Sequence, residues 1–262
     1  MKKTFLITLF LFIAPFISIA QTDITIDSLI IQGKQQLKQA ENTWEEADLL
    51  QARAYFERLL SEPSSKAWLV RYYIGLADYR LTSFHFSKQN QNQAKPFIDD
   101  GIDQLLQCIE AKPDFAEAHS LLSSMYGNKI AVSPFSAMTL GPKAGKEMDK
   151  AMALEPHNPR NYLIQAWSAY YTPKMFGGSK EKAKKHFEQA IACFDSFKVA
   201  DPLLPNWGHE EAYAWLGVVQ VKDGEFESAK ANFEKALEIN PEYAWVNYVL
   251  LPDLQKKMMA IK

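Results

Sequence analysis

The stretch AYAWLGVVQVKDGEFESAKANFEKALEINP, from Ala212 to Pro241, contains two amphipathic runs that a short polar turn separates. In the second run, Ala229, Phe233 and Ala236 follow one another at spacings of four and three. These spacings place the three side chains on one face of a helix, where small residues let a neighbouring helix approach closely. The stretch therefore predicts two antiparallel helices joined by a turn at Gly224.

The same order of a small, a large and another small or apolar residue recurs four times upstream. It reads Ala52-Phe56-Leu59, Gly101-Leu105-Cys108, Ala144-Met148-Ala151 and Ala183-Phe187-Ala190. A second apolar pattern precedes each copy, as in Tyr213-Leu216-Gly217. Because proline cannot continue a helix, the prolines after the copies are expected to separate successive units. The chain is therefore predicted to be a repeated antiparallel helix pair.

This pattern resembles the tetratricopeptide repeat (TPR), most closely between Ala212 and Pro241. Gln220 departs from it, because the family prefers an aromatic residue there. The resemblance implies an all-α fold, a right-handed superhelical array of about five helix pairs with C-terminal capping helices. The distance between successive prolines is longer than the repeat length of the family, which is about 34 residues. HEAT-like repeats, with a longer period, are the structural alternative.

The repeat boundaries follow the apolar patterns and the prolines. We expect repeats at about 25–63, 66–113, 115–156, 159–202 and 208–241, within one domain from 21 to 262 whose cap is 242–262. The excess length is assigned to insertions between paired helices, at Gly127–Lys143 and Thr172–Ser179. We interpret the stretch Gly177-Gly178-Ser179-Lys180 as a turn, after which Ser179 caps the next helix. A phosphate-binding loop is not favoured, because such a loop needs a preceding strand and more glycines.

The first twenty residues have the pattern of a signal peptide. Lys2 and Lys3 precede an apolar run from Phe5 to Ile19, and Ser18-Ile19-Ala20 offers small residues for cleavage. We expect an exported protein, periplasmic or secreted, with no membrane span after cleavage. An uncleaved anchor is the alternative, although the run is short for a span.

Composition sets limits on the partner. The net charge of −2 and the lack of a basic stripe argue against nucleic acid. Cys108 and Cys193 fall in non-adjacent repeats, so two free thiols are favoured over a disulfide.

The sequence offers no catalytic, cofactor or metal site. The five histidines form neither HExxH nor a cluster with Cys at metal-ligand spacing. No GxSxG nucleophile elbow occurs. We therefore expect a protein that is not an enzyme and has no cofactor.

The expected binding surface is the inner face of the array, formed by the first helix of each pair. The residues predicted to line this groove are Tyr73, Arg80, Leu163, Trp167 and Tyr170. Aromatic side chains near an arginine favour an extended peptide or a helix as ligand. The carboxylate clamp of some TPR proteins is absent, because Ser120, Ser124, Leu163 and Trp167 occupy its positions. The alternative is that the apolar Gly127–Lys143 insertion folds back over the groove.

Two functions follow from this surface. The first is an exported, non-catalytic scaffold that binds a protein or peptide in its groove. The second is a small-molecule-binding envelope protein, resembling the TPR-like components associated with TRAP transporters.

Overall fold

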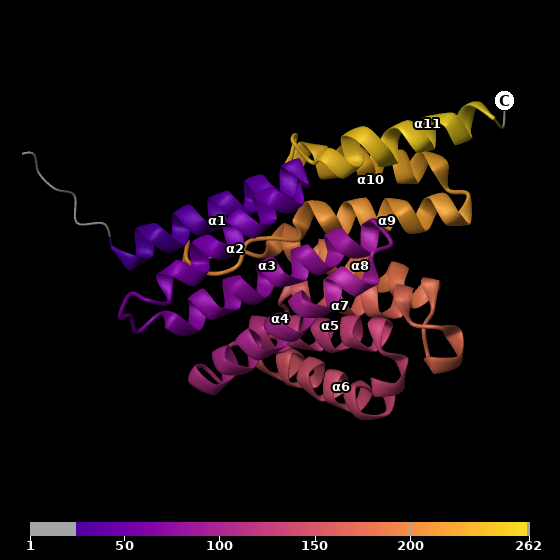
Figure 1. The fold of residues 1–262 in the computed structure, drawn as a ribbon. Coiled ribbons are helices and arrows are strands. Elements are labelled where there is room, and N and C mark those ends of the chain that lie inside the picture. Colours follow the sequence, from indigo (N-terminus) through magenta and orange to yellow (C-terminus); the bar gives the residue numbers. More distant parts are fainter. Residues whose placement is uncertain (1–24, 200, 261–262) are drawn as a thin grey trace, which may run out of the picture.

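The computed structural model describes residues 25–199 and 201–260, and this part of the chain is an array of helix pairs (Figure 1). The signal-peptide prediction concerns residues outside this range. Each of the five predicted repeat ranges holds two antiparallel helices. The pairs are α1 (Ile26–Thr43) with α2 (Glu46–Leu59), α3 (Ala67–Ser87) with α4 (Gln91–Ala111), α5 (Ala116–Val132) with α6 (Ala137–Leu154), α7 (Pro159–Tyr171) with α8 (Lys180–Ser196), and α9 (His209–Asp223) with α10 (Phe226–Ile239). The π-helix η3 (Val246–Leu250) and α11 (Leu251–Met259) follow and cover α10.

The predicted packing within the pairs is confirmed. A Cβ added at Gly217 in α9 would lie 2.4 Å from Cε1 of Phe233 in α10, so the phenyl ring packs directly on the α9 backbone. At Gly75 in α3, the same construction meets Leu105 of α4 at 2.8 Å. The large residue of each second helix is buried, as Phe56, Leu105, Phe187 and Phe233 show, except for the partly buried Met148. The fold is an all-α solenoid, as predicted.

The two predicted insertions differ in structure. Thr172–Ser179 is a turn with a short 3₁₀ helix, η2 (Lys174–Phe176). The turn interpretation of Gly177 and Ser179 is confirmed, because Gly177 has a φ of +92° and the Ser179 hydroxyl accepts a hydrogen bond from the backbone N–H of Lys182. The insertion predicted at Gly127–Lys143 is wrong for most of its length. Here α5 and α6 are simply longer, and the 3₁₀ helix η1 (Pro134–Ser136) joins them.

Both cysteines are free thiols, with Cys108 buried and Cys193 partly buried. Burial raises the pKa of the Cys108 thiol to about 12. Among the described helices, none is both long and apolar enough to span a membrane.

Candidate functional site

The first helices α3 and α7 line the concave side of the array, and a segment of the same chain fills the space between them. This groove segment is the connector between α8 and α9, residues 197–208, and its described part includes the sequence DPLLPNWG at 201–208. Pro202 and Pro205 keep it out of a helix. Leu203 and Trp207 are nevertheless only 5% and 6% exposed. The groove therefore already holds a peptide segment, supplied by the chain itself. Residues 201–204 form a turn, in which the Leu204 N–H donates to the Asp201 carbonyl oxygen at 3.0 Å, and residues 205–208 have no regular secondary structure.

Side chains of the groove hold the segment by its main-chain carbonyl groups. The Tyr73 hydroxyl donates to the carbonyl oxygen of Leu203 at 2.5 Å. Nζ of Lys34 in α1 donates to the carbonyl oxygens of Pro202 and Leu204, at 2.5 and 2.6 Å. Burial and the nearby Arg160 guanidinium lower the pKa of Lys34 to about 8, although Asp201 opposes them. Since every residue has a carbonyl group, these contacts hold the backbone of the segment and do not depend on its side chains.

Trp207 is the main side-chain anchor of the segment. Its ring stacks on Trp167 of α7 with an interplanar angle of 3° and a centroid distance of 6.4 Å. Its indole N–H donates to the Tyr72 hydroxyl at 2.9 Å. The guanidinium of Arg80 lies over the same ring, 5.1 Å from its centroid. A buried aromatic ring with its N–H satisfied is the kind of contact that contributes most to binding energy.

A glycine lets the chain leave the groove. Gly208 has a φ of +103°, and a Cβ there would lie 2.8 Å from Cδ2 of Leu163 in α7. Both the positive φ and the contact with Leu163 require glycine at this position. Leu163 thus packs on the end of the groove segment just before α9 begins.

Four of the five predicted groove residues, Tyr73, Arg80, Leu163 and Trp167, are buried by the chain's own contacts. The fifth, Tyr170, is only partly buried and packs on Trp215 with ring centroids 5.4 Å apart. Its hydroxyl accepts a hydrogen bond from Nζ of Lys222. The structure therefore brings the predicted residues together on one face. A cover formed by Gly127–Lys143 was the alternative that the sequence left open. In the structure, Trp207 of the groove segment stacks on Trp167.

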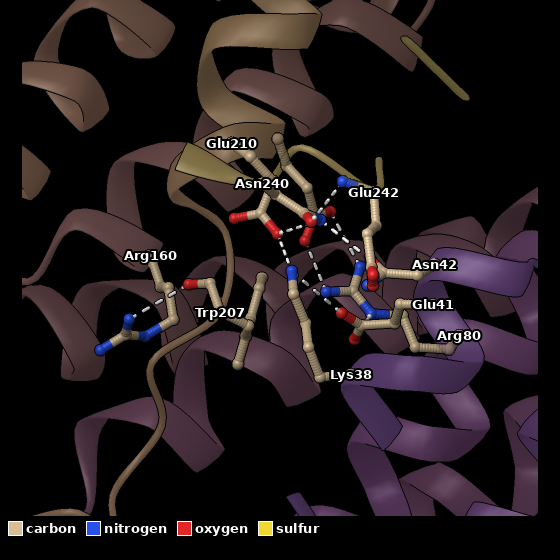
Figure 2. A network of polar contacts seen from close by, with 10 residues as sticks. Lys38, Glu41, Asn42, Arg80, Arg160, Trp207, Glu210, Asn240 and Glu242 are labelled. Atoms are coloured by element: carbon tan, nitrogen blue, oxygen red, sulfur yellow. Dashed lines mark hydrogen bonds and ion pairs between the residues drawn. The ribbon is translucent and has the colours of Figure 1, made fainter. Parts of the chain in front are cut away.

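Arg80 pairs with acidic groups of its own chain. Its guanidinium donates to both carboxylate oxygens of Glu211 in α9, at 2.8 and 2.5 Å. It also donates to Glu41 in α1 at 2.7 Å (Figure 2). Burial opposes the charge of Arg80, but Glu211 and Glu41 hold its pKa well above the ordinary value. Burial also raises the pKa of Glu41, although Arg80 and Lys38 oppose this effect. Arg80 thus links the second repeat to both the first and the fifth.

The same network joins the two ends of the array (Figures 1 and 2). Lys38 of α1 forms an ion pair with Glu210 of α9. Nδ2 of Asn42 donates to Glu242 at 3.0 Å, and Asn240 donates to Asn42 at 2.9 Å. Burial lowers the pKa of Lys38, but Glu210 and Glu41 together outweigh this effect, so the pKa is raised overall. The end of α1 therefore meets the beginning of α9 and the chain just after α10.

A second buried ion pair, between Arg160 of α7 and Glu117 of α5, contacts the groove segment. Nε of Arg160 in α7 donates to both oxygens of Glu117 in α5, at 2.7 and 2.8 Å, and Nη1 donates to the carbonyl oxygen of Trp207 at 3.2 Å. Asn158 also donates to Glu117 at 2.7 Å. Arg160 is 1% exposed and Glu117 is 4% exposed. The pair therefore fixes Arg160 in the position from which it holds the segment.

Sequence reasoning missed the groove segment and the partners Lys34, Tyr72 and Arg160. One available signal was the length of the connector. Repeats two and three are joined by only Lys112–Phe115, whereas residues 197–208 join repeats four and five. A long connector that carries a tryptophan and two leucines is unusual for a solvent-exposed loop. That Trp207 faces Trp167 follows from the curvature of the array, which the sequence pattern does not determine.

The histidines make local contacts. His119 is buried, with its ring nitrogens 2.5 Å from a Glu147 oxygen and 3.0 Å from the Pro113 carbonyl oxygen. His209 begins α9 and stacks on Phe194. In the described part of the chain, no group of three or more His, Cys, Asp and Glu residues is placed to hold a metal ion.

Comparison with known proteins bears on the fold. The sequence model of the tetratricopeptide repeat family matches residues 210–243. The HusA haemophore from Porphyromonas gingivalis is similar in structure, with a TM-score of 0.63 and 23% identity, covering 76% of this chain and 94% of that one. A thermophilic TPR protein from Thermus thermophilus is similar with a TM-score of 0.53 and 18% identity, covering 90% of this chain and 98% of its own. No curated protein matches the chain in sequence.

Proposed function

We propose that this chain, a tetratricopeptide-repeat protein by the match at residues 210–243 and by its fold, is a non-catalytic scaffold that binds a peptide segment of a protein partner in its groove. Tyr73, Arg80, Leu163, Trp167 and Tyr170 are the proposed binding residues. The partner would contribute an aromatic anchor and backbone carbonyl groups. It would bind when residues 197–208 leave the groove.

The observation that carries this proposal is the way the groove holds its own segment. Tyr73, Lys34 and Arg160 donate to backbone carbonyl groups, while Trp167 and Arg80 contact the single ring of Trp207. Main-chain hydrogen bonds together with one or two side-chain pockets are a common means of recognising peptide segments. Because the internal segment competes with any partner, it also lowers the apparent affinity of the groove.

The test empties the groove and supplies the segment as a separate peptide. In one variant, glycine and serine replace residues 201–207, so the connector keeps its length. We expect the free peptide 199–209 to bind this variant and not the wild-type chain, as measured by isothermal titration calorimetry. The matched control is the same peptide with Trp207→Ala, which should bind at least about tenfold more weakly, since such an anchor contributes about 2 kcal/mol or more.

A second variant with a single substitution is used in case the replacement of residues 201–207 prevents folding. Trp207→Ser keeps the rest of the segment and weakens only its anchor, so it should bind the free peptide more weakly than the emptied variant does. A folded, emptied variant that binds neither peptide would show that the groove is not a peptide site. For a natural partner, the emptied variant should capture more protein from an envelope extract than the wild type, and peptide 199–209 should release it.

A second candidate function is the binding of a small apolar molecule. It is favoured by the fold similarity to the HusA haemophore, which covers most of this chain. The groove is rich in aromatic side chains, with Trp167, Trp207 and Trp215 close together. Titration of the wild-type and emptied chains with haem, followed by its Soret absorption band, tests this candidate. A shift in the band that Trp167→Ala removes would favour it over the peptide scaffold.

The proposal also includes export. It rests on Lys2-Lys3, the apolar run from Phe5 to Ile19, and Ser18-Ile19-Ala20. Mass spectrometry of the protein from an envelope fraction should find a chain that begins near Gln21. A chain found only in the cytosol and starting at Met1 would contradict export.

A further inference from the structure

Two neighbouring turns of the array expose large apolar side chains to solvent. Phe135 in the α5–α6 turn is 100% exposed, and Met138 in the first turn of α6 is 90% exposed. The α7–α8 turn carries Met175, 82% exposed, and Phe176, 70% exposed, next to Tyr171. Contiguous exposed apolar groups on a soluble domain usually mark a site of interaction. We call these two turns the apolar tips.

The apolar tips lie at the same edge of the array. The helices α5 and α7 pack against each other, and each is followed by a turn at its C-terminal end. In Figure 1 both turns project from one side of the molecule, beyond the ends of the helices. The turns of two other pairs carry only polar residues and glycine, as Lys88-Gln89-Asn90 and Lys222-Asp223-Gly224-Glu225 show. Among these four turns, exposed large apolar side chains therefore occur only in those of the third and fourth pairs.

The two sequence stretches that carry the apolar tips contain basic but no acidic residues. The chain as a whole has more acidic than basic residues. Yet no Asp or Glu occurs from Ala118 to Lys146, or from Pro156 to Lys180. Lys143, Lys146, Lys174 and Lys180 are exposed in these stretches, and none of the four forms an ion pair with another described residue. A partner that fits this edge is thus both apolar and anionic.

We propose that the apolar tips bind the surface of a membrane that contains anionic lipids. Phe135, Met138, Met175 and Phe176 would enter the boundary between headgroups and acyl chains, while the lysines remain among the headgroups. Burial of the apolar groups and attraction of the lysines both favour binding, and together they give reversible attachment rather than a span. A lipid surface accommodates projecting side chains without a matching recess, whereas a protein interface needs shape complementarity. Attachment at this edge is separate from the groove and independent of the proposed peptide binding.

The experiment is sedimentation with lipid vesicles. The chain that begins at Gln21 is used, because the apolar run before it would itself enter lipid and the described helices all lie after it. We expect binding to vesicles of equal parts phosphatidylcholine and phosphatidylglycerol. We expect binding weaker by about tenfold or more to vesicles of phosphatidylcholine alone, because each lysine near an anionic surface adds to the attraction. Added salt should weaken binding to the anionic vesicles for the same reason.

Variants at the exposed positions identify the surface. Phe135→Ser with Phe176→Ser should lower the vesicle partition coefficient on the order of tenfold, since binding scales with the buried apolar area. Lys143→Glu with Lys174→Glu should lower it similarly, but only for anionic vesicles. The matched control is Tyr248→Ser, which removes an aromatic side chain that is 80% exposed in η3, outside the apolar tips, and should leave binding unchanged.

Two outcomes would overturn the proposal. One is a wild-type chain that stays in the supernatant with both kinds of vesicle. The other is binding that the tip variants and Tyr248→Ser change equally. Melting temperatures of all variants should match the wild type, because every substituted side chain is exposed. A protein captured at the tips by chemical cross-linking, with no vesicle binding, would assign this edge to a protein partner instead.

Discussion

Gly178 lies where the backbone of Thr172 leaves no room for a side chain. A Cβ at this position would be 1.7 Å from the Thr172 carbonyl oxygen. Its neighbour Gly177 faces open space but has a φ of +92°. The two glycines of one turn are therefore required for different reasons. The sequence indicated a glycine-dependent turn, but it did not tell a close approach from a positive φ.

The variant Gly178→Ala should destabilise the protein, because the turn backbone must shift to admit the methyl group. We expect a loss of about 1–3 kcal/mol in the free energy of unfolding, measured by urea denaturation. The control is Gly145→Ala in α6, where the Cβ meets nothing within 4 Å. Since alanine favours a helix over glycine, the control should gain about 0.5–1 kcal/mol. Equal effects of the two variants would contradict the close approach.

Asp78 is a buried acid in α3 with one well-placed partner. Nε of Arg53 donates to its Oδ1 at 2.5 Å, and Oδ2 has no hydrogen-bond partner among the described residues. Burial raises the pKa of Asp78 from about 3.8 to about 7, although Arg53 opposes the rise. The folded state thus holds the Asp78 proton more tightly than the unfolded chain does.

This shift predicts a pH dependence of stability. The contribution of protonated Asp78 is fully present below a pH of about 3.8 and is lost as the pH rises through about 7. Asp78→Asn cannot ionise, so its stability relative to the wild type should increase between these pH values. Urea denaturation at several pH values measures the difference. A constant difference across this range would show that Asp78 is ionised in the folded protein throughout.

At the scale of the element, the helix pair is the unit that the sequence specifies. The spacing of Ala229, Phe233 and Ala236 was enough to predict that α10 packs on α9, because these contacts lie within about 30 residues of sequence and repeat. Phe233 is 1% exposed and contacts the backbone at Gly217. The length of a helix was less predictable. The polar and apolar residues from Gly127 to Lys143 suit either a loop or a longer helix, and packing of α5 on α6 decides between them.

The variant Phe233→Ala tests this packing. Removing the ring leaves a cavity that the glycine backbone at Gly217 cannot fill, so we expect a loss of about 3–5 kcal/mol. The measurement is thermal and urea unfolding. Leu106→Ala in α4 serves as control. Because Leu106 is 44% exposed, its substitution should lower the free energy of unfolding much less. A Phe233→Ala protein that melts close to the wild type would show that the register of α9 on α10 is wrong.

At the scale of the whole molecule, the decisive contacts join residues far apart in the sequence. Arg80 meets Glu211, and Trp167 meets Trp207, across the concave side. Neither contact has a periodic signature, because both depend on how far five helix pairs curve. The sequence pattern indicated a shared face for Tyr73, Arg80, Leu163, Trp167 and Tyr170, and their binding of a partner stays a prediction. The pattern could not predict that a connector fills the groove or that the two ends of the array meet.

The buried network at this junction predicts the effect of removing its central cation. In Arg80→Met, the apolar stem is kept, but the carboxylates of Glu41 and Glu211 remain buried without the guanidinium. We expect a loss of about 3–5 kcal/mol at neutral pH, because an uncompensated buried charge is costly. Adding Glu211→Gln should recover part of the loss. Lys230→Ala removes a cation from an exposed pair and should change stability by less than about 1 kcal/mol.

The same variant tests whether Arg80 holds the two ends of the array together or only packs on Trp207. If Arg80 holds the ends together, Arg80→Met should also widen the molecule, and small-angle X-ray scattering should report a larger radius of gyration. Without Arg80, the pKa of Glu41, which burial already raises, should rise further. Stability linked to a raised carboxyl pKa is present at acid pH and lost as the pH rises, so the deficit of the variant should shrink on acidification. A stability loss that is independent of pH, in a molecule of unchanged size, would mean that Arg80 contributes by packing on Trp207 alone.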